Sequence, residues 1–176
     1  MATSMKSILI TQCLQNDFVR PLDRYDPLPN LLHVGYDEAN RLLGERVEEG
    51  PVAKIIRWAY AQPSDALQII HIRDWHDETD SEQNGHLMQF GKHCLKNSTG
   101  ASFVFEHLIR EDREHAIVDA SGLNDFYKTN LETYLKDCEV ASTKVNDRDV
   151  INGSAASTVS TIETKVRVGI IGVWTE

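Results

Sequence analysis

The stretch LQIIHIRDWH, residues 67–76, decides how the rest of the chain is interpreted. Its first six residues are mostly apolar and include three isoleucines, a composition typical of a strand inside a sheet. Asp74 and His76 follow, two residues apart. Because alternate side chains of an extended chain lie on the same face, we expect this carboxylate and this imidazole to point at a common ion.

Two further histidines, His86 and His93, come from the loop after this strand. Three neutral imidazoles and a carboxylate suit zinc, with iron or manganese as alternatives, and leave coordination positions for water or a substrate. The alternative is that Asp74 caps a turn and that the histidines are ordinary loop residues. An Asp-x-His pair directly after a buried strand favours a metal site, which we predict at Asp74, His76, His86 and His93.

Composition limits the remaining possibilities. A chain of 176 residues is long enough for a single domain, residues 1–176, with a substantial core. The net charge of −9 argues against nucleic-acid and anionic-membrane partners, which need a basic face. No signal peptide is expected, and no apolar run approaches the roughly 18 residues that span a bilayer. Three widely spaced cysteines predict no disulfide framework and fit a reducing, cytoplasmic setting.

The order of the predicted elements indicates the fold class. Residues 7–11 predict a first buried strand, and the polar cluster at residues 12–17 follows where open α/β sheets place their chemistry. Residues 31–43 and 52–60 show helical spacing, and Pro51 is well placed to begin the second helix. A strand, helices and a second strand predict a βαβ unit, and therefore an α/β fold with a parallel sheet.

Four short motifs carry a resemblance to a known family. They are QNDF at residues 15–18, DWH at 74–76, HC at 93–94 and TGA at 99–101. In these motifs the chain resembles the nicotinamidase and isochorismatase superfamily of cysteine hydrolases, and within it the nicotinamidase-like branch, over most of residues 6–101 and again near the C-terminal end. The resemblance implies a three-layer α/β/α domain with a central parallel sheet. It also implies a divalent metal at the four ligands named above, with Phe18 and Phe90 in the substrate pocket.

The resemblance further implies a catalytic triad of Asp, Lys and Cys, which this chain matches poorly. Cys13 stands at the family's Asp position. A thiol with an ordinary pKa near 8.5 is a poor substitute for a carboxylate that accepts a proton. Asp17 is a carboxylate nearby, although in the family it belongs to the turn.

The position of the lysine depends on the alignment. One register matches Phe126 and Thr129 to the family's segment after the lysine, predicts a strand at residues 116–118 and puts Ala120 in the lysine's place. The other register makes residues 138–140 the strand before the lysine, so that Lys144 is the candidate catalytic amine. Each register requires an insertion somewhere within residues 105–165. The sequence leaves both registers open.

Residues 166–173 predict another buried strand, and residues 172–176 resemble the family's segment before the catalytic cysteine. In the family that cysteine would come two residues after Glu176. We therefore expect a fold that is incomplete at its C-terminal end. An unpaired strand edge and an uncovered apolar face favour a homo-oligomer or completion by another polypeptide.

Two classes of function follow. The altered triad favours a catalytically degenerate domain that keeps the metal and serves as a binding or assembly module. The alternative is a metal-assisted cysteine hydrolase, an amidase that acts on a nicotinamide-like C–N bond of a small molecule, with its nucleophile supplied from outside residues 1–176.

Overall fold

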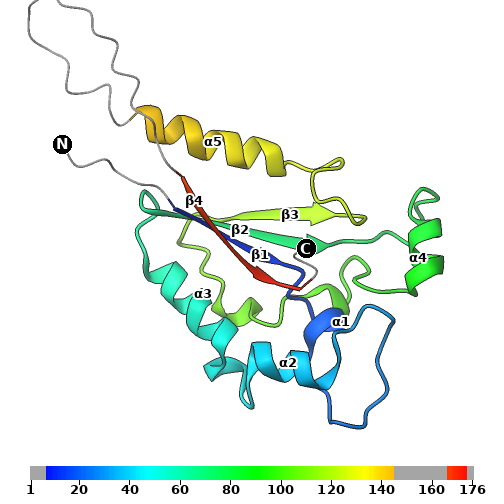
Figure 1. The fold of residues 1–176 in the computed structure, drawn as a ribbon. Coiled ribbons are helices and arrows are strands. Elements are labelled where there is room, and N and C mark those ends of the chain that lie inside the picture. Colours follow the sequence, from blue (N-terminus) through cyan, green and yellow to red (C-terminus); the bar gives the residue numbers. More distant parts are fainter. Residues whose placement is uncertain (1–6, 145–165, 174–176) are drawn as a thin grey trace, which may run out of the picture.

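The computed structural model describes residues 7–144 and 166–173, with side chains up to residue 138 in the first range. Its centre is a parallel sheet of four strands in the order β3-β2-β1-β4 (Figure 1). The strands are β1 (Ser7–Gln12), β2 (Leu67–Asp74), β3 (Ala116–Ala120) and β4 (Arg167–Gly172). Because they all run in the same direction, their carboxyl ends meet at one edge of the sheet.

Helices lie on both faces of this sheet. They are α1 (Asn16–Val19), α2 (Gly35–Leu43), α3 (Pro51–Ala61), α4 (Asn84–Phe90) and α5 (Leu131–Lys144), with short 3-10 turns at Val47–Glu49, Thr99–Ala101 and Glu106–Leu108. Helices α2 and α3 lie on one face and α5 lies on the other (Figure 1). Pro51 begins α3, where its fixed φ suits the helix and its missing N–H leaves no hydrogen bond unmade.

The alternation of side chains along β1 builds the two halves of the core. Leu9 packs on the face that also buries Leu43 and Ile56 of α2 and α3. Ile8 and Ile10 point to the opposite face, where they pack in the cluster that contains Leu131 of α5. Burial of each such aliphatic side chain stabilises the fold by about 1.5–3 kcal/mol. The predicted three-layer arrangement with a central parallel sheet is confirmed.

Most of the predicted elements form where the sequence pattern places them. The strands at residues 7–11 and 67–72 and the helix at residues 52–60 are confirmed as β1, β2 and α3. The helix predicted at residues 31–43 begins only at Gly35. The strand at residues 116–118 is confirmed as β3, which pairs with β2 along Ile70–Asp74.

The second alignment register is wrong about residues 138–140. They lie inside α5 and form no strand. The reason is the spacing of Leu131, Leu135 and Cys138, four and three residues apart, which puts them on one helical face packed against the sheet. The argument that made Lys144 the catalytic amine therefore fails. Lys144 is the last residue of α5, and its side chain lies outside the described part of the structure.

The strand predicted at residues 166–173 is β4, but it is not buried as expected. Val168 and Ile170 are each 52% exposed, because β4 is the last strand of the described sheet and pairs there with β1 alone. Residues 146–164 and 174–176, which carry much of the predicted insertion and most of the predicted approach to a catalytic cysteine, lie outside the described residues. Within the described ranges, every helix is too short or too polar to cross a lipid bilayer.

Candidate metal centre

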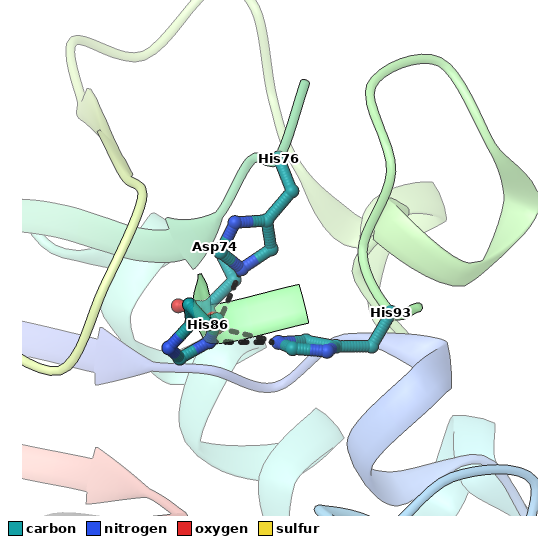
Figure 2. Close-up of side chains that lie close together, drawn as sticks. All are labelled: Asp74, His76, His86 and His93. Atoms are coloured by element: carbon teal, nitrogen blue, oxygen red, sulfur yellow. Dashed lines mark hydrogen bonds and ion pairs between the residues drawn. The ribbon is translucent and has the colours of Figure 1, made fainter. Parts of the chain in front are cut away.

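One carboxylate and three imidazoles converge beyond the carboxyl end of β2. One ligand atom from each of Asp74, His76, His86 and His93 lies within 4.8 Å of every other (Figure 2). His76 Nε2 is 3.4 Å and His93 Nε2 is 3.6 Å from Asp74 Oδ2. His86 Nε2 is 3.3 Å from His93 Nε2. The structure thus brings together all four residues that the sequence singled out as ligands.

Backbone pairing explains how two of these residues meet. The His76 N–H donates to the Cys94 carbonyl over 3.0 Å, and the Lys96 N–H donates to the His76 carbonyl over 2.8 Å. These bonds form a short parallel bridge between the segment after β2 and the segment after His93. Helix α4 lies between His76 and His93 in the sequence and carries His86, whose ring stacks 5.0 Å from the His76 ring.

A second layer of hydrogen bonds orients two of the rings. His93 Nδ1 is 2.7 Å from the Gly91 carbonyl oxygen, and His76 Nδ1 is 3.1 Å from Gln83 Oε1. Gln83 is itself fixed, since its Oε1 accepts from the Asp77 N–H and its Nε2 donates to Asp80. Oxygen acceptors at both Nδ1 atoms favour a proton there in a neutral ring. The Nε2 atoms face the shared centre, where each donates to Asp74 when protonated and offers its lone pair to a metal ion when not, as in histidines that ligate metals.

The pKa values of Asp74 and His86 favour a cation in the cluster, whereas that of His93 opposes it. Burial alone would raise the pKa of Asp74, but hydrogen bonds from His76 and His93 outweigh burial and hold that pKa below its ordinary value. Burial lowers the pKa of His86, and the neighbouring histidines lower it further. Burial also lowers the pKa of His93, but its bonds to Asp74 and Gly91 outweigh this and raise it. A cation would therefore compete with a proton at His93.

These residues fit a divalent metal ion. A tetrahedral zinc site with bonds of about 2.0–2.2 Å separates its ligand atoms by roughly 3.3–3.6 Å. Three of the six separations in the cluster, at 3.3, 3.4 and 3.6 Å, agree with that spacing, and all six are within 4.8 Å. Asp74, His76 and His93 are at most 8% exposed, so nearly all of the donor set is shielded from water. The same nitrogen and oxygen donors also suit iron and manganese.

Two polar side chains of the segment after β1 hold the surrounding backbone in place. Gln15 is fully buried, accepts from the Asp74 N–H and donates to the carbonyls of Asp74 and Ala101. Asp17 Oδ2 accepts the Cys94 N–H over 2.7 Å. A Cβ on Gly100 would lie 2.0 Å from that oxygen, so only glycine allows this approach. Asp17 therefore positions the loop that carries His93.

A cavity of about 650 Å³ opens beside the cluster, and Asp74 forms part of its wall. Phe18 and Phe90, the two predicted pocket aromatics, both line it. The Phe18 ring lies 5.5 Å from the His93 ring, and the Phe90 ring lies 4.8 Å from the His86 ring. The volume is within the range of small-molecule sites. The position at the carboxyl edge of a parallel sheet is also typical of ligand sites in open α/β folds.

Cys13 lines the same cavity but has the properties of an unreactive thiol. Its Sγ is 3.8 Å from Asp74 Oδ1, and its side chain is only 5% exposed. Burial, and then the negative charge of Asp74, raise the pKa of Cys13 well above its ordinary value. The pKa of Cys94 is raised for the same two reasons. At both residues this environment favours the thiol over the thiolate.

Sequence reasoning missed two side chains that contribute to this region. Gln83 orients His76 from seven residues away, and nothing in its local sequence distinguishes it from other polar loop residues. Asp125 lines the cavity from the loop between β3 and α5. It directly precedes Phe126, which the first register matched to the family. That register puts Ala120, the last residue of β3, in the place of the lysine.

Comparisons with known proteins find likeness in structure but not in sequence. No protein-family model matches the chain, and no curated protein sequence matches it significantly. The pyrazinamidase/nicotinamidase of Streptococcus mutans is similar with a TM-score of 0.56 at 19% identity, over 76% of this chain and 67% of that one. An isochorismatase-like hydrolase of Alkaliphilus metalliredigens gives a TM-score of 0.54 at 22% identity, over 76% and 62%. The pyrazinamidase of Pyrococcus horikoshii in complex with zinc gives 0.53 at 20% identity, over 96% and 70%.

The chain spans 62% of the Alkaliphilus hydrolase and 66% of a nicotinamidase/pyrazinamidase of Bacillus subtilis, which is less than two thirds of each. Identities of 18–22% with these four structures bear on the fold alone. The order of strands, the helices on both faces and these likenesses together show that this chain has the isochorismatase-like hydrolase fold, which nicotinamidases and pyrazinamidases share.

Proposed function

We propose that this chain binds a divalent metal ion, with zinc first and iron or manganese as alternatives, and that the metal-loaded cavity binds a small molecule without hydrolysing it. Asp74, His76, His86 and His93 would hold the ion. When bound, the ion would supply a Lewis-acidic position for a nitrogen or oxygen atom of the ligand, since these ions can take more than four donors.

One observation carries this proposal: four ligand atoms within 4.8 Å of one another lie at the wall of a cavity of about 650 Å³. In water, three imidazoles would gain little from being packed around a carboxylate. Burying this cluster without a partner for all its lone pairs is unfavourable, and a shared cation satisfies them together. Phe18 and Phe90 add aromatic surface that can pack against a flat ligand.

The chemistry of the described cavity residues supports binding over hydrolysis. A cysteine hydrolase needs a base that takes a proton from its nucleophile. Cys13, at the position where the resemblance implies that base, is a buried thiol with a raised pKa. No lysine is among the described residues that line the cavity, and Ala120 ends the strand where the first register expects one.

The alternative is a metal-assisted amidase that acts on a nicotinamide-like C–N bond. Structural likeness to pyrazinamidases and nicotinamidases, one of them in complex with zinc, favours this candidate. It requires a nucleophile from outside the described residues. The amidase would use the same metal cluster as the binding domain, so metal binding alone does not distinguish the two candidate functions.

Ammonia release distinguishes binding without hydrolysis from amidase activity. We expect the complete polypeptide, loaded with zinc, iron or manganese, to bind pyridine in calorimetry only when metal is present, and to release no ammonia from nicotinamide or pyrazinamide above the rate in buffer. The physical reason is that Cys13, at the position where the resemblance implies the base, is a buried thiol with a raised pKa, and that no lysine is among the described residues that line the cavity. Turnover at about 1 s⁻¹ or faster, which is within the ordinary range of enzymes, would contradict the binding role and favour the amidase.

We also propose that a second copy of the chain or another polypeptide covers β4, and that the protein works in a reducing, cytoplasmic compartment. The exposed side chains of Val168 and Ile170 support the first point, because such apolar surface on an edge strand favours association. The odd number and wide spacing of the three cysteines, which predict no disulfide framework, support the second.

A further inference from the structure

Asp125 is a carboxylate in the cavity wall that the metal centre does not use. It lies in the loop between β3 and α5 and is half-buried. Gln12, the last residue of β1, donates from its Nε2 to Asp125 Oδ2 over 2.8 Å. The Thr129 hydroxyl donates to the Asp125 backbone carbonyl. These two bonds, from two different elements of the fold, fix Asp125 at the wall that also contains Asp74 and Cys13.

The negative charge of Asp125 has no cationic partner within the described residues. Lys128, three residues further on, pairs with Glu82, and Arg41, which also lines the cavity, pairs with Glu38. Burial, and then the charge of Asp74, raise the pKa of Asp125 to about 6. A carboxylate in this environment is poorly solvated, and a cationic group that enters the cavity would relieve the cost of its burial.

The metal cluster and Asp125 therefore favour different chemical groups on a ligand. The metal cluster, by the function proposed above, takes an atom with a lone pair. Asp125 takes an N–H donor, and best a protonated amine, because hydrogen bonds between charged groups are the strongest. The same cavity is lined by the aromatic rings of Phe18 and Phe90, by aliphatic side chains, and by Gln12, which already donates to Asp125. An anionic substituent at the Asp125 wall would meet like charge there.

We propose that Asp125 determines the specificity of the cavity by accepting a hydrogen bond from an amine or other N–H group of a small aromatic ligand, and that the site therefore prefers cationic ligands to carboxylates. This inference rests on the proposed function, because the aromatic nitrogen of the ligand is held by the metal. It goes beyond that function in naming the class of ligand and the residue that selects it.

The test is a calorimetric comparison of three pyridines on the zinc-loaded protein at pH 7.5: pyridine itself, 3-(aminomethyl)pyridine and pyridine-3-carboxylate. We expect the amine to bind about tenfold or more tightly than pyridine, and the carboxylate to bind more weakly than the amine. In the Asp125→Asn variant we expect the amine to lose about tenfold in affinity, while pyridine changes by less than about twofold.

The matched control is Asp65→Asn, which removes a carboxylate at an exposed position outside the cavity. It should leave all three affinities as they are in the unsubstituted chain. Circular dichroism on each variant reports whether the fold is intact. An equal loss for pyridine and the amine in Asp125→Asn would show a structural role and reject selection by Asp125.

The outcomes separate the two proposals. If pyridine binds only with zinc present, but the carboxylate binds as tightly as the amine, or Asp125→Asn leaves the preference unchanged, the specificity of Asp125 is rejected and the metal-dependent binding stands. If pyridine does not bind to the zinc-loaded chain at all, the proposed function fails and this inference falls with it.

Discussion

Replacement of His76 by glutamine is expected to lower the affinity of the chain for zinc by about 100-fold or more. Substitutions of residues that only support a metal ligand already lower affinity by about 10–100-fold, and His76 is expected to be a ligand itself. A carboxamide is a much weaker donor than an imidazole, and the substitution also removes the ring that Gln83 orients. Competition with a chromogenic chelator gives the two dissociation constants.

The control for this prediction is His107→Gln. His107 is an exposed histidine of the 3-10 turn Glu106–Leu108 and lies outside the metal cluster. We expect this variant to bind zinc as the unsubstituted chain does. A fall of less than about threefold for His76→Gln, with the fold intact, would mean that zinc binds elsewhere on the chain.

The second large effect concerns stability in acid. His71 is fully buried in β2, with its Nδ1 2.8 Å from the Thr11 hydroxyl and its Nε2 2.9 Å from the Tyr60 hydroxyl. Burial, and then the nearby charge of His115, lower the pKa of His71 from 6.5 to about 3. The folded state therefore resists protonation of this ring, whereas the unfolded chain takes up the proton near pH 6.5.

The sign of the pH dependence follows from these two pKa values. The stabilisation is complete above pH 6.5 and is lost as the pH falls from 6.5 towards 3. The expected loss is about 1.4 kcal/mol of unfolding free energy for each pH unit in that window. In His71→Phe this contribution disappears. That variant should be less stable than the unsubstituted chain by about 1–3 kcal/mol at pH 7, because two buried hydroxyls lose a partner.

Urea unfolding without added metal, repeated between pH 7 and pH 4, measures how the unfolding free energy of the unsubstituted chain and of His71→Phe changes with pH. The comparison of the two proteins isolates His71 from other groups that titrate in the same window. His107→Phe, at the exposed position, should keep the full slope of the unsubstituted chain. If His71→Phe and the unsubstituted chain lose stability in parallel as the pH falls, the buried ring is not the origin of the effect.

The fold can be predicted from the sequence in the segments where one physical signal dominates. The apolar, β-branched composition of residues 67–72 predicts β2, because a strand buried on both faces needs apolar side chains on both. Residues 131–140 carry two competing signals. Their Cys-Glu-Val segment suggests a strand when it is aligned to a family, but the spacing of Leu131, Leu135 and Cys138 favours a helix, and packing against the sheet decides for the helix.

The candidate site likewise contains residues that the sequence predicts and residues that it does not. Asp74 and His76 are predictable because two residues at the end of one strand are related by local geometry. The approach of His86 and His93 depends on α4 and on the bridge between His76 and Leu95. Local rules do not give such contacts, so the sequence could place both predicted ligands only in the loop that follows the strand. Asp125 was not predictable, since it reaches the cavity through a contact with Gln12 that spans 113 positions in the sequence.

The central claim is that one divalent cation is held by Asp74 and three histidines beside the cavity. Anomalous X-ray diffraction at the zinc edge, on crystals of the zinc-loaded chain, tests it most directly. We predict a single strong peak at about 2.0–2.2 Å from Asp74 Oδ2 and from the Nε2 atoms of His76, His86 and His93. A zinc-saturated crystal with no peak among these four side chains, or with the side chains turned apart towards solvent, would contradict the account.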